Sequence, residues 1–184
     1  MRARAEPDED ELYHRVLYAV LYDDMAALRA ALDAAPEEGD ADAYDDFIGR
    51  YDLVDKALTA ACRYGNLEHA QALVDEYDAL PGFNALTAAV LNGQARVFEF
   101  LVSAGADPHE CDTFGIYDVE CTRLLLEAGV AVDPKNLVEA VHYEWFDLLC
   151  FLLDRGVDAC RAEALALATQ RNMPEYIQRL QAAA

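Results

Sequence analysis

A stretch of eighteen residues occurs twice in this chain, and that repetition constrains the fold more than any other feature. Residues 57–74 read ALTAACRYGNLEHAQALV, and residues 85–102, 28 positions further on, read ALTAAVLNGQARVFEFLV. Leu137 and Leu165 repeat the same spacing. Self-similarity at a fixed period of this length indicates a repeat architecture, in which each unit stacks on its neighbour.

Each copy reads as a pair of helices. Two apolar stripes with the i, i+3, i+4 spacing of an α-helix lie on either side of Gly65 or Gly93. After the second stripe, Gly105, Gly129 and Gly156 stand where a helix ends in a left-handed residue. No unit can bury both of its faces alone. We therefore predict an all-α fold, a helical-hairpin repeat solenoid of about six irregular units.

The six units differ in length. We place them at about 12–35, 55–80, 84–108, 112–132, 135–158 and 162–182, within a single repeat domain covering 12–184. Residues 1–11 read as an acidic tail, and residues 36–50 as an acidic insertion. The fourth unit has room for only about one turn of its first helix, around residues 112–118.

The third unit resembles an ankyrin repeat. In residues 84–109, the matching positions are occupied by Leu86, Ala89, Gly93, Leu101, Gly105, Ala106 and Asp107. The resemblance implies a curved stack of helix pairs that binds other proteins along its concave face. Ankyrin repeats run to about 33 residues. The spacing of 28 here therefore predicts short or absent β-hairpin fingers, and an irregular helical-hairpin solenoid of another kind is the structural alternative.

The charge is strongly one-sided. The chain has 14 Lys and Arg residues against 35 Asp and Glu residues, a net charge of −21. Residues 1–55 hold 16 of the acidic residues and 5 of the basic ones. Such a surface repels nucleic acid and anionic membranes, so we expect neither as a partner. It attracts a basic protein, although acidity that only keeps the protein soluble is the alternative explanation.

No catalytic or metal-binding motif stands out. The four histidines show no H-x-x-x-H pair, and we expect His69 to face solvent on an outer helix. Residues 40–51 do not fit a calcium-binding EF-hand loop, because Tyr44, Asp45 and Tyr51 stand where a ligand, a glycine and a glutamate are needed. We predict no enzymatic activity, no cofactor and no metal site.

The five cysteines are an odd number without C-x-x-C spacing, and no secretory signal pattern or apolar run of 18 residues accompanies them. These features predict a cytoplasmic protein with reduced thiols. Separately, we expect the protein to be monomeric. We expect Cys62 and Cys150 to act as small core residues.

The ankyrin resemblance also implies candidate partner-binding residues. The two residues before each turn are free of core packing in that pattern, which points to Tyr22, Arg63, Tyr64, Asn92, His142, Tyr143 and Arg171. We add Trp145, the only tryptophan, at the turn of the fifth unit, and Tyr44 in the acidic insertion. Phe114 and Tyr117 lie where the shortened helix leaves a notch in the stack. Half-buried packing is the alternative role for each tyrosine.

These features favour a non-enzymatic interaction module that binds a basic protein through its concave face. A specific inhibitor is the first alternative, either an immunity protein or a DNA mimic acting on a nuclease, a toxin or a nucleic-acid-binding protein. A general scaffold and a calcium-regulated module built on residues 36–50 are the others.

Overall fold

The structure is a computed structural model, which describes residues 9–35 and 49–182. Within these ranges the chain forms eleven α-helices, a short 3-10 helix and no strand. The prediction of an all-α helical-hairpin solenoid without β-hairpin fingers is therefore confirmed. None of the described helices is long and apolar enough to cross a membrane.

Ten of the helices form five pairs. In chain order the pairs are α1 (Glu9–Leu21) with α2 (Met25–Asp33), α3 (Arg50–Tyr64) with α4 (Leu67–Tyr77), α5 (Phe83–Leu91) with α6 (Ala95–Ser103), α8 (Asn136–His142) with α9 (Phe146–Asp154), and α10 (Arg161–Gln170) with α11 (Pro174–Ala182). The remaining helix, α7 (Val119–Glu127), follows the 3-10 helix η1 (Pro108–Glu110). Helix α1 begins at Glu9, within the segment that the sequence assigned to the tail.

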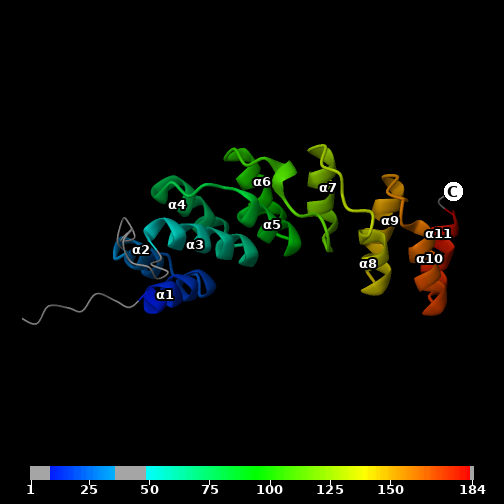
Figure 1. Cartoon of the computed structure of the whole chain (residues 1–184), viewed down its shortest axis with the longest axis horizontal. Helices are drawn as coiled ribbons and strands as arrows, with labels where there is room; N and C mark the ends of the chain where they lie inside the picture. Colours follow the sequence, from blue (N-terminus) through cyan, green and yellow to red (C-terminus); the bar gives the residue numbers. More distant parts are fainter. Residues whose placement is uncertain (1–8, 36–48, 183–184) are drawn as a thin grey trace, which may run out of the picture.

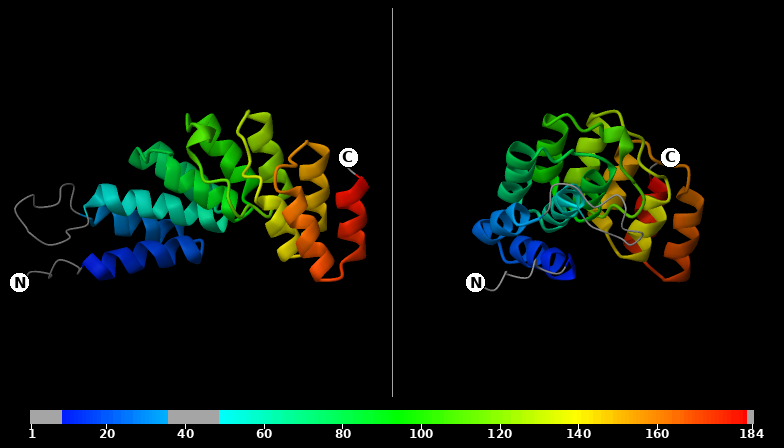
Figure 2. Two further views of the ribbon diagram at one scale, coloured as in Figure 1. Left: turned by 45° about the vertical axis from the view of Figure 1, so that its right-hand side comes forward. Right: turned by 60° about the vertical axis from the view of Figure 1, so that its left-hand side comes forward.

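The pairs stack into an arc. Figure 1 shows the first helix of each pair along the inner side, with α4, α6, α7 and α9 along the outer side. Figure 2 shows the pairs following one another in chain order from α1 to α11. Because the two helices of a pair are antiparallel, the turns between them lie along one edge of the arc and the connections between units lie along the other.

The turn between paired helices requires one left-handed residue. Gly65 and Gly93 occupy this position in the second and third units, with φ of +76° and +68°. Asp23, Glu144 and Asn172 occupy it in the first, fifth and sixth units. A residue with a Cβ pays about 1–2 kcal/mol for this conformation, so the turns of these three units are the more strained ones. The predicted helix ends at Gly105, Gly129 and Gly156 are likewise left-handed, as expected.

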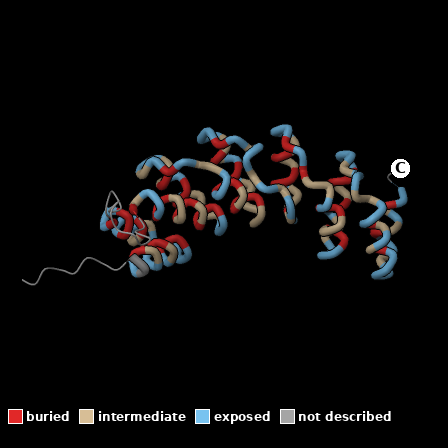
Figure 3. Tube along the Cα trace, viewed as in Figure 1, coloured by how far each residue is buried: buried red, intermediate tan, exposed pale blue. Residues whose placement is uncertain are grey.

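Buried residues lie on the parts of the helices that face one another, as the colouring of Figure 3 shows. They form two clusters, one from Leu12 to Val130 and one from Val132 to Leu180. Cys62 is fully buried, as predicted, whereas Cys150 is only half-buried. The core is divided after the fourth unit because that unit has no inner helix to continue the layer between α5 and α8.

The prediction for His69 was wrong. It lies on α4, which is an outer helix, but its side chain is only 1% exposed. The first turn of α4 packs against the turn of the first unit, where Nδ1 of His69 lies 3.2 Å from Oδ1 of Asp23. His69 looks solvent-exposed when α4 is considered alone, but the packing of the second unit on the first buries it.

The fourth unit also differs from the prediction. No α-helix forms around residues 112–118; apart from a tight turn at residues 114–115, the chain runs there without regular structure from η1 to α7. We call residues 111–118 the strap. Asn136 at the start of α8 is 1% exposed and holds the strap at two points. Its Nδ2 donates to the Thr113 carbonyl at 2.6 Å, and its Oδ1 accepts from the Gly115 amide at 2.9 Å. Ile116 is fully buried and fills the space of the missing helix.

Candidate functional site

The turns between paired helices bind back to the unit before them. Asn66 Nδ2 donates to the Val20 carbonyl at 2.5 Å, and Arg171 Nη1 donates to the His142 carbonyl at 2.6 Å. The last carbonyls of a helix have no partner inside it, so these side chains satisfy groups that the fold leaves open. At these two places the turn of one unit is therefore fixed to the end of the inner helix of the unit before it.

The predicted residues of the first two units lie exposed on this edge. Tyr22 is 71% exposed and its ring is parallel to that of Tyr18, with centroids 5.8 Å apart. Tyr64 is 50% exposed at the end of α3, and Arg63 beside it is also exposed. Such large side chains at a surface are the usual anchors of protein interfaces.

Asn92 has a different environment. It is half-buried, and its Nδ2 donates to the Ala88 carbonyl at 2.8 Å in its own helix. The side chain therefore closes the end of α5. Tyr44 lies outside the described residues, as does the acidic segment 36–48 on which the calcium alternative rests.

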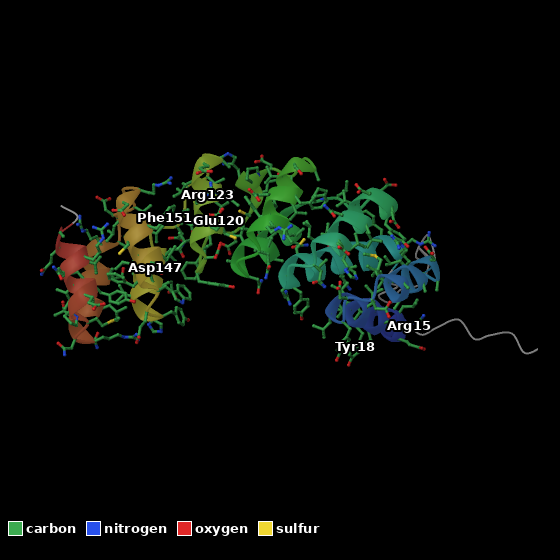
Figure 4. All side chains as sticks on the ribbon, turned by 180° about the vertical axis from the view of Figure 1, so that it is seen from behind. Arg15, Tyr18, Glu120, Arg123, Asp147 and Phe151 are labelled. Atoms are coloured by element: carbon green, nitrogen blue, oxygen red, sulfur yellow. The ribbon has the colours of Figure 1, made fainter. Side chains whose placement is uncertain are left out.

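A groove of about 540 Å³ runs between α1 and α3 on the inner side of the arc. We call it the inner groove. Its apolar lining comes from Tyr13, Leu17, Tyr18, Leu21, Ala60 and Tyr64, and its polar lining from His14, Asp55, Lys56, Thr59, Arg63 and Asn84. Figure 4 shows Tyr18 and Arg15 on α1, at the end of the stack away from Asp147 and Phe151.

The sequence-based site residues include only Arg63 and Tyr64 from this groove. A signal for the others was present, because Tyr13, Leu17 and Leu21 follow one another at intervals of four and so share a face of one helix. That face borders the core stripe of the same helix, and Tyr13 and Leu17 pack partly against the core. A second apolar stripe on a helix that begins a stack is the pattern that would have identified the groove.

Four rings gather at the turn edge of the fourth and fifth units. Tyr117 and Trp145 have centroids 5.6 Å apart, and Tyr143 stacks on Trp145 at 4.9 Å with planes 22° apart. The His142 ring meets Tyr143 edge-on at 4.8 Å. We call these four residues the aromatic row. All four were predicted from the sequence, and Arg171, also predicted, reaches the row by placing Nη2 3.1 Å from Nδ1 of His142.

Phe114, the remaining predicted residue, is 45% exposed on the strap. Its backbone amide donates to Oδ1 of Asp112 at 2.9 Å, which shapes the turn in which it sits. No ring contact joins Phe114 to the aromatic row among the described residues. Its ring is therefore accessible to a partner, and its role in binding stays a prediction.

The described carboxylate side chains lie on the surface of the molecule. No Asp or Glu is buried among the residues whose side chains the structure describes. Arg29 on α2 donates to both carboxylate oxygens of Glu76 on α4, at 2.8 Å and 2.5 Å, and this hydrogen bonding lowers the pKa of Glu76. Arg123 is likewise shared between Glu120 and Glu127 on α7. Several arginines are thus engaged by acids of the same chain, and the surplus of negative charge faces outward.

The described residues contain no cluster of three or more His, Cys, Asp or Glu side chains that could hold a metal ion. Burial raises the pKa of the Cys62 thiol to about 12 and that of Cys111 to about 11, which keeps both thiols protonated at neutral pH. A protonated thiol is a poor nucleophile. The arrangement is suited to binding through grooves and exposed rings.

Comparison with known protein families gives a match. A family model described as ankyrin repeats (3 copies) matches residues 17–112, just over half of the chain. The match runs from α1 to the first residues of the strap, so it ends where the inner helix of the fourth unit is replaced. No curated protein matches the chain.

Proposed function

Because the chain belongs to the ankyrin repeat family, we propose that it acts by binding a basic protein along the inner side of its arc and catalyses no reaction. Ankyrin repeats form protein–protein interaction modules, since stacked units create an extended concave surface. What we propose beyond this is that the partner is basic, that it binds on the inner side of the arc and that the protein catalyses no reaction.

The inner groove is the observation that carries this proposal. Tyr18, Leu21 and Tyr64 at its rim are 56%, 48% and 50% exposed. A hollow of about 540 Å³ with exposed aromatic and aliphatic rims has the size and the concave, largely apolar character of a binding site. The groove can take an apolar side chain of a partner and surround it with tyrosine rings.

The partner's charge is inferred from the surface around the groove. The lining itself has one carboxylate, Asp55, and two basic side chains, Lys56 and Arg63, so it carries no acidic excess of its own. The net charge of −21 comes from the rest of the surface. In this arrangement the apolar groove supplies the contact, while the acidic surface speeds the approach of a basic protein in a salt-dependent way.

The test is capture of partners from the native cell lysate at low and at moderate salt, followed by mass spectrometry. The variant Tyr18→Ala/Tyr64→Ala removes two exposed rims of the groove. Tyr51→Ala is the matched control, because Tyr51 is 65% exposed on α3 but does not line the groove. We expect one basic partner whose capture weakens with salt and is lost in the double variant alone. A neutral partner captured equally well at both salt concentrations, or by both variants, contradicts the proposal.

A specific inhibitor is the second candidate, and the density of exposed carboxylates favours it. An acidic surface can occupy the basic substrate site of a nuclease, a toxin or a nucleic-acid-binding protein. A stoichiometric basic partner whose activity falls in proportion to added protein would identify this role. If the bound partner keeps its full activity, the protein is a scaffold and not an inhibitor.

We further propose that the protein is monomeric and cytoplasmic. All five cysteines are unpaired in the structure, which fits a reducing compartment. Size-exclusion chromatography with light scattering checks the first statement, and cell fractionation checks the second.

A further inference from the structure

Tyr117 bridges the gap that the missing helix leaves. Its phenol packs against the turn of the third unit, where a Cβ placed on Gly93 would lie only 3.0 Å from the Tyr117 Oη. Its ring lies 5.6 Å from that of Trp145, at the turn of the fifth unit. In the fourth unit, which has no inner helix, the Tyr117 ring of the strap therefore contacts the turn of the third unit on one side and that of the fifth unit on the other.

The rings of the aromatic row remain open to solvent. Tyr143 is 56% exposed and Tyr117 is 43% exposed, and Trp145 between them is half-buried. The strap that positions Tyr117 is held by the buried side chain of Asn136, so this exposure is built into the fold. The row lies on the edge that carries the turns, apart from the inner groove between α1 and α3.

The chemistry of the row favours a planar cation. The faces of Trp and Tyr rings carry partial negative charge and attract cations, and guanidinium groups also stack on them. Arg171, at the edge of the row, makes hydrogen-bonding contacts instead: its guanidinium donates to the His142 carbonyl and lies 3.1 Å from Nδ1 of the His142 ring. Asp118 follows Tyr117 and Glu144 precedes Trp145 in the chain, so the segments that carry the rings are acidic, although the Asp118 carboxylate itself accepts from the Cys121 amide at 2.8 Å.

We propose that the aromatic row is a second docking site, which stacks arginine side chains from an extended segment of the partner protein. This inference rests on the proposed function, in that the partner is basic, and it adds which basic side chain is read. Lysine fits less well, because its compact ammonium is strongly hydrated and cannot stack as a plane. The row lies outside the inner groove, so a partner that fills both is held at two separate places.

Trp145 makes the site directly measurable, because it is the only tryptophan in the chain. The full chain is titrated with a Gly/Ser peptide that contains four arginines, and with a matched peptide that contains four lysines. Neither peptide contains an aromatic residue. We expect the arginine peptide to change the Trp145 emission and to bind about 2- to 5-fold more tightly than the lysine peptide at moderate salt, the range expected for exposed cation–π contacts.

Variants at Tyr143 separate stacking from charge. Tyr143→Leu removes one ring face, and we expect it to abolish most of the preference for arginine. Tyr143→Phe keeps the ring and should keep the preference. Tyr51→Leu, on α3, is the control for loss of an exposed tyrosine elsewhere. Thermal unfolding of each variant shows that the chain is folded in the titration.

Two results overturn the inference. The first is equal binding of the arginine and lysine peptides, which means that only net charge is read. The second is binding of a labelled arginine peptide, seen by fluorescence anisotropy, without any change in Trp145 emission, which places the peptide elsewhere.

Cellular capture separates this inference from the proposed function. A basic partner lost with Tyr18→Ala/Tyr64→Ala but unaffected by Tyr143→Leu refutes the aromatic row alone, whereas arginine binding at the row without any basic partner in the lysate refutes the proposed function alone.

Discussion

Replacing Gly65 with alanine tests whether the turn edge couples neighbouring units. Gly65 has φ of +76°, and a Cβ there would lie 2.1 Å from Oε1 of Gln94 in the next unit. The left-handed backbone costs an alanine about 1–2 kcal/mol. Gln94 must also move, which breaks its bonds to the carbonyls of Asn92, at 3.0 Å, and Arg63, at 3.5 Å. Losing one net hydrogen bond adds about 0.5–1.5 kcal/mol.

Gly129 provides the matched control. Its φ is +82°, but a Cβ there would meet no atom within 4 Å. We therefore expect Gly129→Ala to lower the free energy of unfolding by about 1–2 kcal/mol, the backbone cost alone. Gly65→Ala should lower it by about 1.5–3.5 kcal/mol, the sum of the backbone and hydrogen-bond costs.

Urea-induced unfolding followed by circular dichroism measures these differences. A double-mutant cycle with Gln94→Ala isolates the contact between the units. The double variant Gly65→Ala/Gln94→Ala should be no less stable than Gly65→Ala, because the bonds of Gln94 are already lost in the single variant. Equal costs for Gly65→Ala and Gly129→Ala, together with additive effects in the cycle, would refute the reasoning.

Three further predictions follow from buried groups and from the acidic insertion. Asn136→Ala leaves the Thr113 carbonyl and the Gly115 amide without their partner, so it should lower the free energy of unfolding in urea by about 2–4 kcal/mol. The control Asn92→Ala loses one hydrogen bond within its own helix and should lower it by about 1 kcal/mol. At pH 8 a thiol reagent should label Cys62 only after unfolding, because burial raises its pKa from 9.0 to about 12. The neutral thiol favours the folded state below pH 9, and this stability is lost as the pH rises from about 9 to 12, so the urea midpoint should fall over that range. Calcium in millimolar excess should leave the melting temperature unchanged, because residues 40–51 lack the EF-hand ligands, and a rise of several degrees would contradict this.

The repeat period and the positions of glycine were enough to predict the helix pairs and their stacking. These features are local, because an apolar stripe and a left-handed stop such as Gly105 depend on a few neighbouring residues. The same local patterns placed Tyr143 and Trp145 at one turn. The candidate site was therefore partly visible in the sequence.

Contacts between units could not be predicted in this way. His69 looks exposed on its own helix and is buried by the turn of the first unit. The expected helical turn in the fourth unit is a strap, because the Asn136 side chain from the next unit binds its backbone. The inner groove likewise needs both α1 and α3.

The linear order of residues thus determined the units, their helices and the acidic charge, since each of these is a property of short segments or of composition. The tertiary structure alone decided which polar groups are buried, where Tyr117 meets Trp145 and where the inner groove opens. These features depend on how side chains 20 or more residues apart meet across a stacking interface. The repeat period predicts that such an interface exists, but the fit of the side chains decides its shape.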